Sequence, residues 1–145
     1  MHMPAAPVLD LPAAAADLRL AVKLLAHRLR AEGRPGLSWS QESVISLLDR
    51  KESVTVSDLA RTEGVRSQSM GSTVASLAAE GLVHREPDPS DGRQTLVSLT
   101  AKGREALAQT REFKQTWLES VIAERLTPDE QQVLVAAVEL LLRLA

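Results

Sequence analysis

Residues 65–100 read VRSQSMGSTVASLAAEGLVHREPDPSDGRQTLVSLT and decide the fold of this chain. Plotted at about 100° per residue, residues 68–79 form a helix with two distinct arcs. One arc is polar and uncharged, and its members are Gln68, Ser69, Ser72, Thr73 and Ser76. The opposite arc is apolar and predicts burial of Met70, Val74, Leu77 and Ala78. The helix is therefore expected to pack through one arc and to present short hydrogen-bonding side chains on the other.

No acidic residue occurs between Gly64 and Ala79. A solvated helix surface usually interleaves Lys and Glu, so a Ser-rich face without either is unusual, although a plain exposed surface remains the alternative. Phosphates would repel an acid, whereas Gln pairs with adenine edges and Ser or Thr reaches bases and phosphates. The pattern favours a DNA-reading face, and its expected contacts are Arg66, Ser67, Gln68, Ser69, Ser72 and Thr73.

A second, shorter helix is predicted just upstream. The sequence TVSD at residues 55–58 has the spacing of a capping box, with Leu59 pointing inward and Gly64 ending the helix. Gly81 ends the polar-faced helix in the same way. The order helix, glycine-containing turn, helix is that of a helix-turn-helix.

A hairpin is predicted downstream, with strands at residues 82–86 and 95–99. The connection PDPSDGR has prolines that blunt the ribbon edge and a glycine free to take positive φ. At its tip Asp91 lies two residues before Arg93, close enough to hold the guanidinium extended for a narrow minor groove. The alternative is an exposed turn ion pair of little energetic value.

Four short motifs resemble the MarR family of bacterial transcription regulators: TVSDLA (55–60), LAAEGLVHR (77–85), DGR (91–93) and VSLTAKG (97–103). The resemblance covers residues 37–103. It implies that residues 66–73 enter the major groove and Arg93 the minor groove, oriented by Asp91. Gly71 departs from a good helix sequence at a cost of about 1 kcal/mol relative to Ala, either to permit close backbone approach to DNA or as a neutral change.

The two ends of the chain predict a homodimer. Residues 133–145 contain only two charged residues, Glu139 and Arg143, so this helix needs cover almost all round. The first helix carries a seam with the spacing of a coiled coil, made of Leu18, Val22, Leu25 and Leu29. A twofold interface of first and last helices satisfies both. Its expected residues are Leu18, Val22, Leu25, Leu134, Val138 and Leu141.

The expected architecture is a single, mainly α-helical chain, residues 1–145, with a winged helix-turn-helix and a two-stranded wing. Residues 37–100 form the DNA-binding region, and residues 13–32 and 101–145 form the dimerisation helices. A helix over about 101–125 spans more than about 35 Å and links the two. The sequence TPDE at 127–130 marks the start of the last helix.

An effector pocket is implied by the resemblance at the junction of the first, second and long helices. Phe113 and Trp117 lie four apart on the long helix, and Trp39 follows Ser38 in a second capping box. His27 is a candidate polar contact, and an aromatic acid or phenol is the expected guest. The alternative is that these aromatic side chains belong to the core and that the histidine is structural or solvated.

Composition limits the other functions. The 145 residues carry a net charge of -2 and no cysteine, and no targeting or membrane-spanning segment is visible, so a cytoplasmic protein is expected. Three scattered histidines and the lack of a phosphate loop predict no catalytic residues, no metal and no cofactor. The negative charge leaves two functions open: a homodimeric repressor of an inverted-repeat DNA operator, or a winged-helix module for protein interaction.

Overall fold

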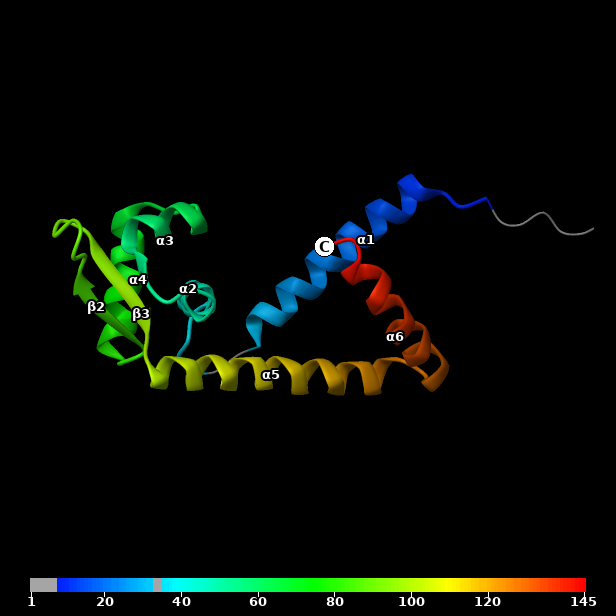
Figure 1. The fold of residues 1–145 in the computed structure, drawn as a ribbon. Coiled ribbons are helices and arrows are strands. Elements are labelled where there is room, and N and C mark those ends of the chain that lie inside the picture. The colour runs from blue at the N-terminus through cyan, green and yellow to red at the C-terminus, as the bar shows by residue number, and fades with distance from the viewer. Residues whose placement is uncertain (1–7, 33–34) are drawn as a thin grey trace, which may run out of the picture. The chain divides into compact units, whose positions relative to one another are not determined.

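The computed structural model describes residues 8–32 and 35–145, and Figure 1 shows them as a ribbon. The chain divides into two compact units, residues 1–31 and 32–145, and each is described by itself. The first unit holds helix α1, Leu11–Ala31. This helix begins two residues before the expected position because Asp10 caps it, its Oδ1 accepting the N–H of Ala13 at 3.0 Å.

The second unit is mainly helical with a small sheet, as expected. Its elements are α2 (Trp39–Asp49), β1 (Val54–Thr55), α3 (Val56–Glu63), α4 (Ser67–Ala79), β2 (Val83–Pro87), β3 (Thr95–Leu99), α5 (Ala101–Arg125) and α6 (Pro128–Leu142). The boundary after residue 31 reflects packing within one chain, so it does not test which segments bind DNA and which form a dimer. The assignment of residues 37–100 to DNA reading and of the flanking helices to dimerisation stays a prediction.

Local signals explain the helix-turn-helix. Thr55 begins α3, its side chain accepting the Asp58 N–H at 3.1 Å, and Gly64 ends the helix at φ 66. The predicted capping box is wrong in its second half, because the Asp58 carboxylate pairs with Arg61 at 2.9 Å. Gly81, at φ 74, follows α4 and lets the chain turn toward the sheet.

The sheet is antiparallel with the strand order β1-β3-β2. The two predicted strands are present, each within one residue of its expected bounds. The two-residue β1 was not predicted; it pairs Val54 with Val97 and Thr55 with Leu96. Strand β2 lies at the edge, where Pro87 costs no ladder hydrogen bond. The loop glycine, Gly92, does not use its freedom to take positive φ, since the described glycines with positive φ are Gly36, Gly64 and Gly81.

The core lies between α2, α3, α4, the sheet and the first third of α5. Met70, Val74 and Leu77 of the apolar arc of α4 are buried, as predicted, and Ala78 is half-buried. They pack with buried side chains of the neighbouring elements, Val44, Ile45, Leu48, Leu59, Leu82, Val97, Ala106 and Leu107. Apolar burial of this kind fixes which arc of α4 remains outside.

The N-terminal part of helix α5 packs against this core. Its observed bounds, Ala101–Arg125, are the predicted ones. Two ion pairs join it to α2: Arg111 to Asp49 at 3.3 Å, and Lys114 to Glu42. Among the residues of α5, all of them described, none beyond Thr110 is buried.

Helix α6 follows α5 and starts with the capping box that the sequence predicts at Thr127 and Glu130. The N–H of Thr127 donates to the Glu130 carboxylate at 2.8 Å, and the Thr127 side chain accepts in return. Within Pro128–Leu142, all of which the structure describes, no residue is buried. The other elements of the second unit thus leave the apolar surface of α6 largely uncovered.

Candidate nucleic-acid interface

The polar arc of α4 lies at the surface. Ser67, Gln68, Ser69 and Ser72 are exposed, and Thr73 is half-buried. Arg66, which immediately precedes the helix, is also exposed and places a positive charge at the positive end of the helix dipole. Of the six residues in this segment that are predicted to touch DNA, five are therefore exposed and one is half-buried.

Ser76 and Thr73 are partly engaged within the protein. The Ser76 hydroxyl donates to the carbonyl of Thr73 at 2.8 Å and accepts from Nε2 of Gln41 on α2 at 3.0 Å. Thr73 donates to the carbonyl of Ser69 at 3.1 Å. Although Ser76 is exposed, its hydroxyl and that of Thr73 already have partners within the protein, so the proposed contacts centre on Gln68, Ser69 and Ser72.

The nearest acid preceding α4 is drawn toward another helix. Glu63, at the end of α3, accepts a hydrogen bond from the Ser43 hydroxyl of α2 at 2.6 Å. No acidic residue occurs in the first turn of α4, all of which is described. Glu63 nevertheless lines a hollow together with Ser69 and Thr73, so a carboxylate borders this surface although α4 itself contributes none.

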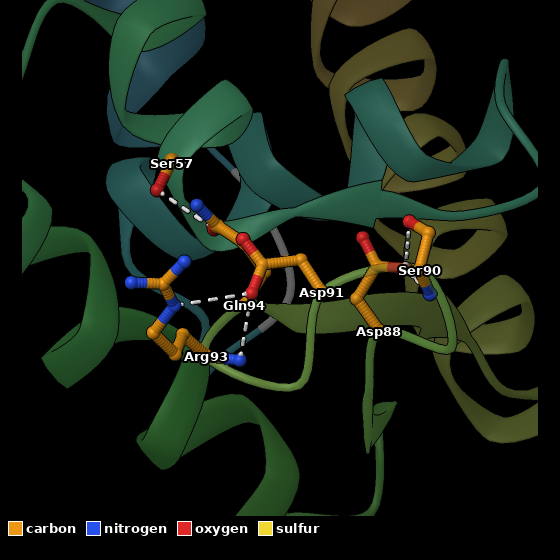
Figure 2. A network of polar contacts seen from close by, with 6 residues as sticks. All are labelled: Ser57, Asp88, Ser90, Asp91, Arg93 and Gln94. Atoms are coloured by element: carbon orange, nitrogen blue, oxygen red, sulfur yellow. Dashed lines mark hydrogen bonds and ion pairs between the residues drawn. The ribbon is translucent and has the colours of Figure 1, made fainter.

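At the wing tip, Arg93 forms an ion pair with Asp91 (Figure 2). Oδ1 of Asp91 accepts both the Arg93 backbone N–H at 3.2 Å and Nε at 3.4 Å. The Arg93 side chain is 94% exposed, whereas that of Asp91 is 44% exposed. Such an exposed pair adds little stability, but it restricts the directions that the guanidinium takes.

A second carboxylate closes the turn in front of Arg93. Asp88 Oδ1 accepts from the backbone N–H of Ser90 at 2.9 Å and from its hydroxyl at 2.7 Å. These hydrogen bonds lower the pKa of Asp88 below its ordinary value of 3.8. The same hydrogen bonds close the turn that precedes Arg93.

Sequence reasoning missed one link of this network, the hydrogen bond from the Ser57 hydroxyl to Oε1 of Gln94 at 3.0 Å. The two residues are 37 positions apart; Ser57 lies on α3, and Gln94 lies in the loop immediately before β3 (Figure 2). The only local signal was that Gln94 adjoins the Asp-Gly-Arg tip.

The predicted dimer residues lie on two helices with little burial of their own. Leu18, Val22 and Leu25 of α1 are exposed, as are Val138 and Leu141 of α6, and Leu134 is half-buried. Among the residues of α1, all of them described, none is buried. These positions are available to a partner, and the interface itself stays a prediction.

Within the second unit, Trp39 and Phe113 line two different hollows. Trp39, 49% exposed, lines a small hollow of about 170 Å³ beside Ser69 and Thr73, and its ring lies 5.7 Å from Lys114 Nζ. Phe113, 51% exposed, lines another of about 270 Å³ on α5. Trp117 is half-buried on α5, and His27 is exposed on α1.

The described residues were also compared with the requirements of a metal site and of a membrane-spanning helix. They contain no group of three His, Cys, Asp or Glu side chains placed to hold a metal ion. Within the same residues, no helix has the length and apolar character needed to cross a membrane.

A helix-turn-helix with an exposed, acid-free second helix, followed by a hairpin with an arginine at its tip, defines the winged-helix class of DNA-binding proteins. Residues 36–94 match the sequence profile of the MarR family. An uncharacterised HTH-type transcriptional regulator of Mycobacterium leprae is 40% identical over 131 residues, which cover 90% of this chain and 91% of that protein. An HTH-type transcriptional repressor of Mycobacterium bovis is 30% identical over 97 residues, covering 67% and 69%.

Solved structures agree with these relatives. A Pseudomonas aeruginosa protein described as a transcriptional regulator has a TM-score of 0.75 at 35% identity, covering 90% of this chain and 91% of that one. The PcaV transcriptional regulator of Streptomyces coelicolor, solved with its natural ligand, has a TM-score of 0.57 at 22% identity, covering 97% and 98%. The chain belongs to the MarR family of transcriptional regulators, which is not a family of enzymes.

Proposed function

We propose that this regulator is a cytoplasmic homodimer that represses transcription by binding an inverted-repeat operator. The observation that carries the proposal is the exposure of Gln68, Ser69 and Ser72 on α4 together with the almost fully exposed Arg93 at the wing tip. Each subunit places α4 in a major groove and Arg93 in a neighbouring minor groove. The half-sites then lie about 10 base pairs apart, one turn of the duplex.

The homodimer is supported by the lack of cover on α6. Seven large apolar side chains of the C-terminal segment are at least 39% exposed in the described chain: Val133, Val135, Val138, Leu140, Leu141, Leu142 and Leu144. A surface of this kind marks an interaction site. A second copy of the same helix offers an equally apolar surface, and twofold symmetry makes it self-complementary.

Repression, rather than activation, is supported by the name of the Mycobacterium bovis relative. Release by a small aromatic acid or phenol is a further part of the proposal. The hollow beside Phe113 supports a ligand site, as does the PcaV structure, which was solved with its natural ligand. The operator titration described next, repeated with such a compound present, tests this release.

The net charge of -2 sets the expected character of binding. Affinity rests on a few placed arginines and on helix N-termini in two copies, so it is moderate and falls as salt rises. The test is a titration with DNA from upstream of the gene and with a shuffled duplex, at about 100–150 mM salt. Selective binding supports a repressor, and weak binding that ignores sequence supports a protein-interaction module instead.

Arg93→Ala is expected to weaken operator binding by about 1–3 kcal/mol. The side chain is almost fully exposed, so its loss leaves the melting temperature nearly unchanged. Fluorescence anisotropy with labelled operator measures the first effect, and thermal unfolding the second. Arg50→Ala, an exposed arginine at the end of α2, serves as the charge-matched control. Unchanged affinity for Arg93→Ala would remove the wing from the interface.

Gln68→Ala is expected to relax base preference at one position of each half-site, because Gln discriminates by pairing with adenine. Competition with operators substituted at single positions measures the preference. The loss for the preferred base should be about 1–3 kcal/mol, with other positions unaffected. A uniform loss across all sequences would instead make Gln68 a phosphate contact.

A further inference from the structure

The position of the wing tip relative to α4 decides whether both can reach DNA together. A guanidinium in the minor groove and a helix in the adjacent major groove must keep a fixed separation. The hairpin of β2 and β3 does little by itself to fix the position of the wing tip. Its outer strand, β2, is an edge strand whose residues from His84 to Pro87 are exposed. On the inner side, β1 pairs only through Val54 and Thr55.

The hydrogen bond between Ser57 and Gln94 extends this support toward the tip. Strand β1 pairs residue 54 with 97 and residue 55 with 96, and the same antiparallel register continued by two positions sets 57 opposite 94. The backbone cannot continue the ladder, because Thr55 is already the cap of α3. A side-chain bond of 3.0 Å between two half-buried residues takes its place.

Gln94 is also the residue at which the tip closes. Its backbone N–H donates to the carbonyl of Asp91 at 2.9 Å, and its carbonyl accepts from the N–H of Asp88 at 3.0 Å. Fixing the Gln94 side chain therefore fixes the turn that holds Asp91, and Asp91 in turn holds Arg93. Figure 2 shows the two side-chain links of this series, Ser57 to Gln94 and Asp91 to Arg93.

We propose that Ser57 and Gln94 are positioning residues that set Arg93 at the height at which α4 and the wing enter adjacent grooves. The inference rests on the proposed function and assigns a role to two residues that need not touch DNA. Through this hydrogen bond, the first turn of α3 fixes the wing tip to the helix-turn-helix. Arg93 and the recognition surface of α4 then keep a constant separation.

A double-mutant cycle with operator DNA tests the proposal, using Ser57→Ala, Arg93→Ala and the double variant in the full-length protein. Losing one hydrogen bond should weaken binding by roughly three- to tenfold when Arg93 is present. When Arg93 is absent, Ser57→Ala should change affinity by less than about twofold, since the two act through one contact. Ser57→Thr, which keeps the hydroxyl, should restore binding.

Ser53→Ala is the control, because Ser53 is exposed just before β1. It should bind like the wild type, and thermal unfolding should show all variants folded. Equal losses for Ser57→Ala in both backgrounds, or no loss in either, would overturn the positioning role while leaving the regulator intact. Wild-type protein that fails to select its operator would instead overturn the proposed function, and this inference with it.

Discussion

A Leu141→Asp chain is expected to lose the dimer and, with it, operator binding. Leu141 lies on α6, whose described residues include none that is buried in the single chain. In the proposed interface the new carboxylate would meet apolar side chains with no positive partner, which costs several kcal/mol. Twofold symmetry applies this cost twice. The dissociation constant of the dimer should therefore rise by about 1,000-fold or more.

Sedimentation equilibrium over a range of protein concentrations measures this change, and circular dichroism shows whether the separated chains stay folded. Gln132→Asp is the matched control, because it adds the same charge to the same helix at an exposed polar position. It should remain a dimer. A Leu141→Asp protein that stays dimeric and binds DNA would place the interface elsewhere.

Gly103→Ala is expected to destabilise the fold strongly. A Cβ at Gly103 would lie 2.1 Å from the carbonyl oxygen of Leu82 and 2.5 Å from Cδ1 of Leu99. The backbone there cannot yield cheaply, because the same Leu82 carbonyl accepts the N–H of Thr100 at 3.1 Å. Overpacking a core usually lowers the free energy of unfolding by up to about 3 kcal/mol. Because this clash is with the backbone, the decrease for Gly103→Ala should be at or above that value.

This position joins the end of α4 to the start of α5. The Thr100 hydroxyl donates to the carbonyl of Gly81 at 2.7 Å, and Lys102 Nζ donates to that of Glu80 at 2.7 Å. A shift of α5 to relieve the clash would therefore also disturb the C-terminal end of the recognition helix. Urea unfolding should show a lower midpoint with an unchanged slope.

Gly71→Ala is the matched control for Gly103→Ala, since a Cβ at Gly71 meets nothing within 4 Å. Alanine should stabilise α4 by about 1 kcal/mol. The same variant decides between the two interpretations of this glycine, because a methyl group at a close DNA contact would weaken operator binding. A Gly103→Ala protein as stable as Gly71→Ala would show that α5 is not held against Leu82.

Much of the fold could be predicted because its signals are local. The bounds of α5, the capping boxes at Ser38 and Thr127, and the glycine stops at Gly64 and Gly81 each depend on residues within one or two turns. The apolar arc of α4 was predicted for a similar reason, because burial follows the period of a single helix.

The missed features depend on contacts between distant residues. Strand β1 has only two residues and no period to detect, and its existence depends on β3, about forty positions later. The Ser57–Gln94 bond, and the one between Gln41 and Ser76, likewise follow from packing that sequence spacing does not show. The Asp58 carboxylate binds Arg61 and does not accept the N–H of Thr55 that the capping box requires. An exposed carboxylate on a helix can also pair with a cation one turn away.

The central claim is that two copies of the surface around Gln68 and Arg93 read one face of the duplex in fixed register. The most direct test is an operator, defined by footprinting, into which five base pairs are inserted between the half-sites. At about 10 base pairs per turn, this insertion moves one half-site to the opposite face of the DNA. The account predicts that affinity falls by about 100-fold or more, to that of a single half-site. Binding of the lengthened operator as tight as that of the original would contradict it.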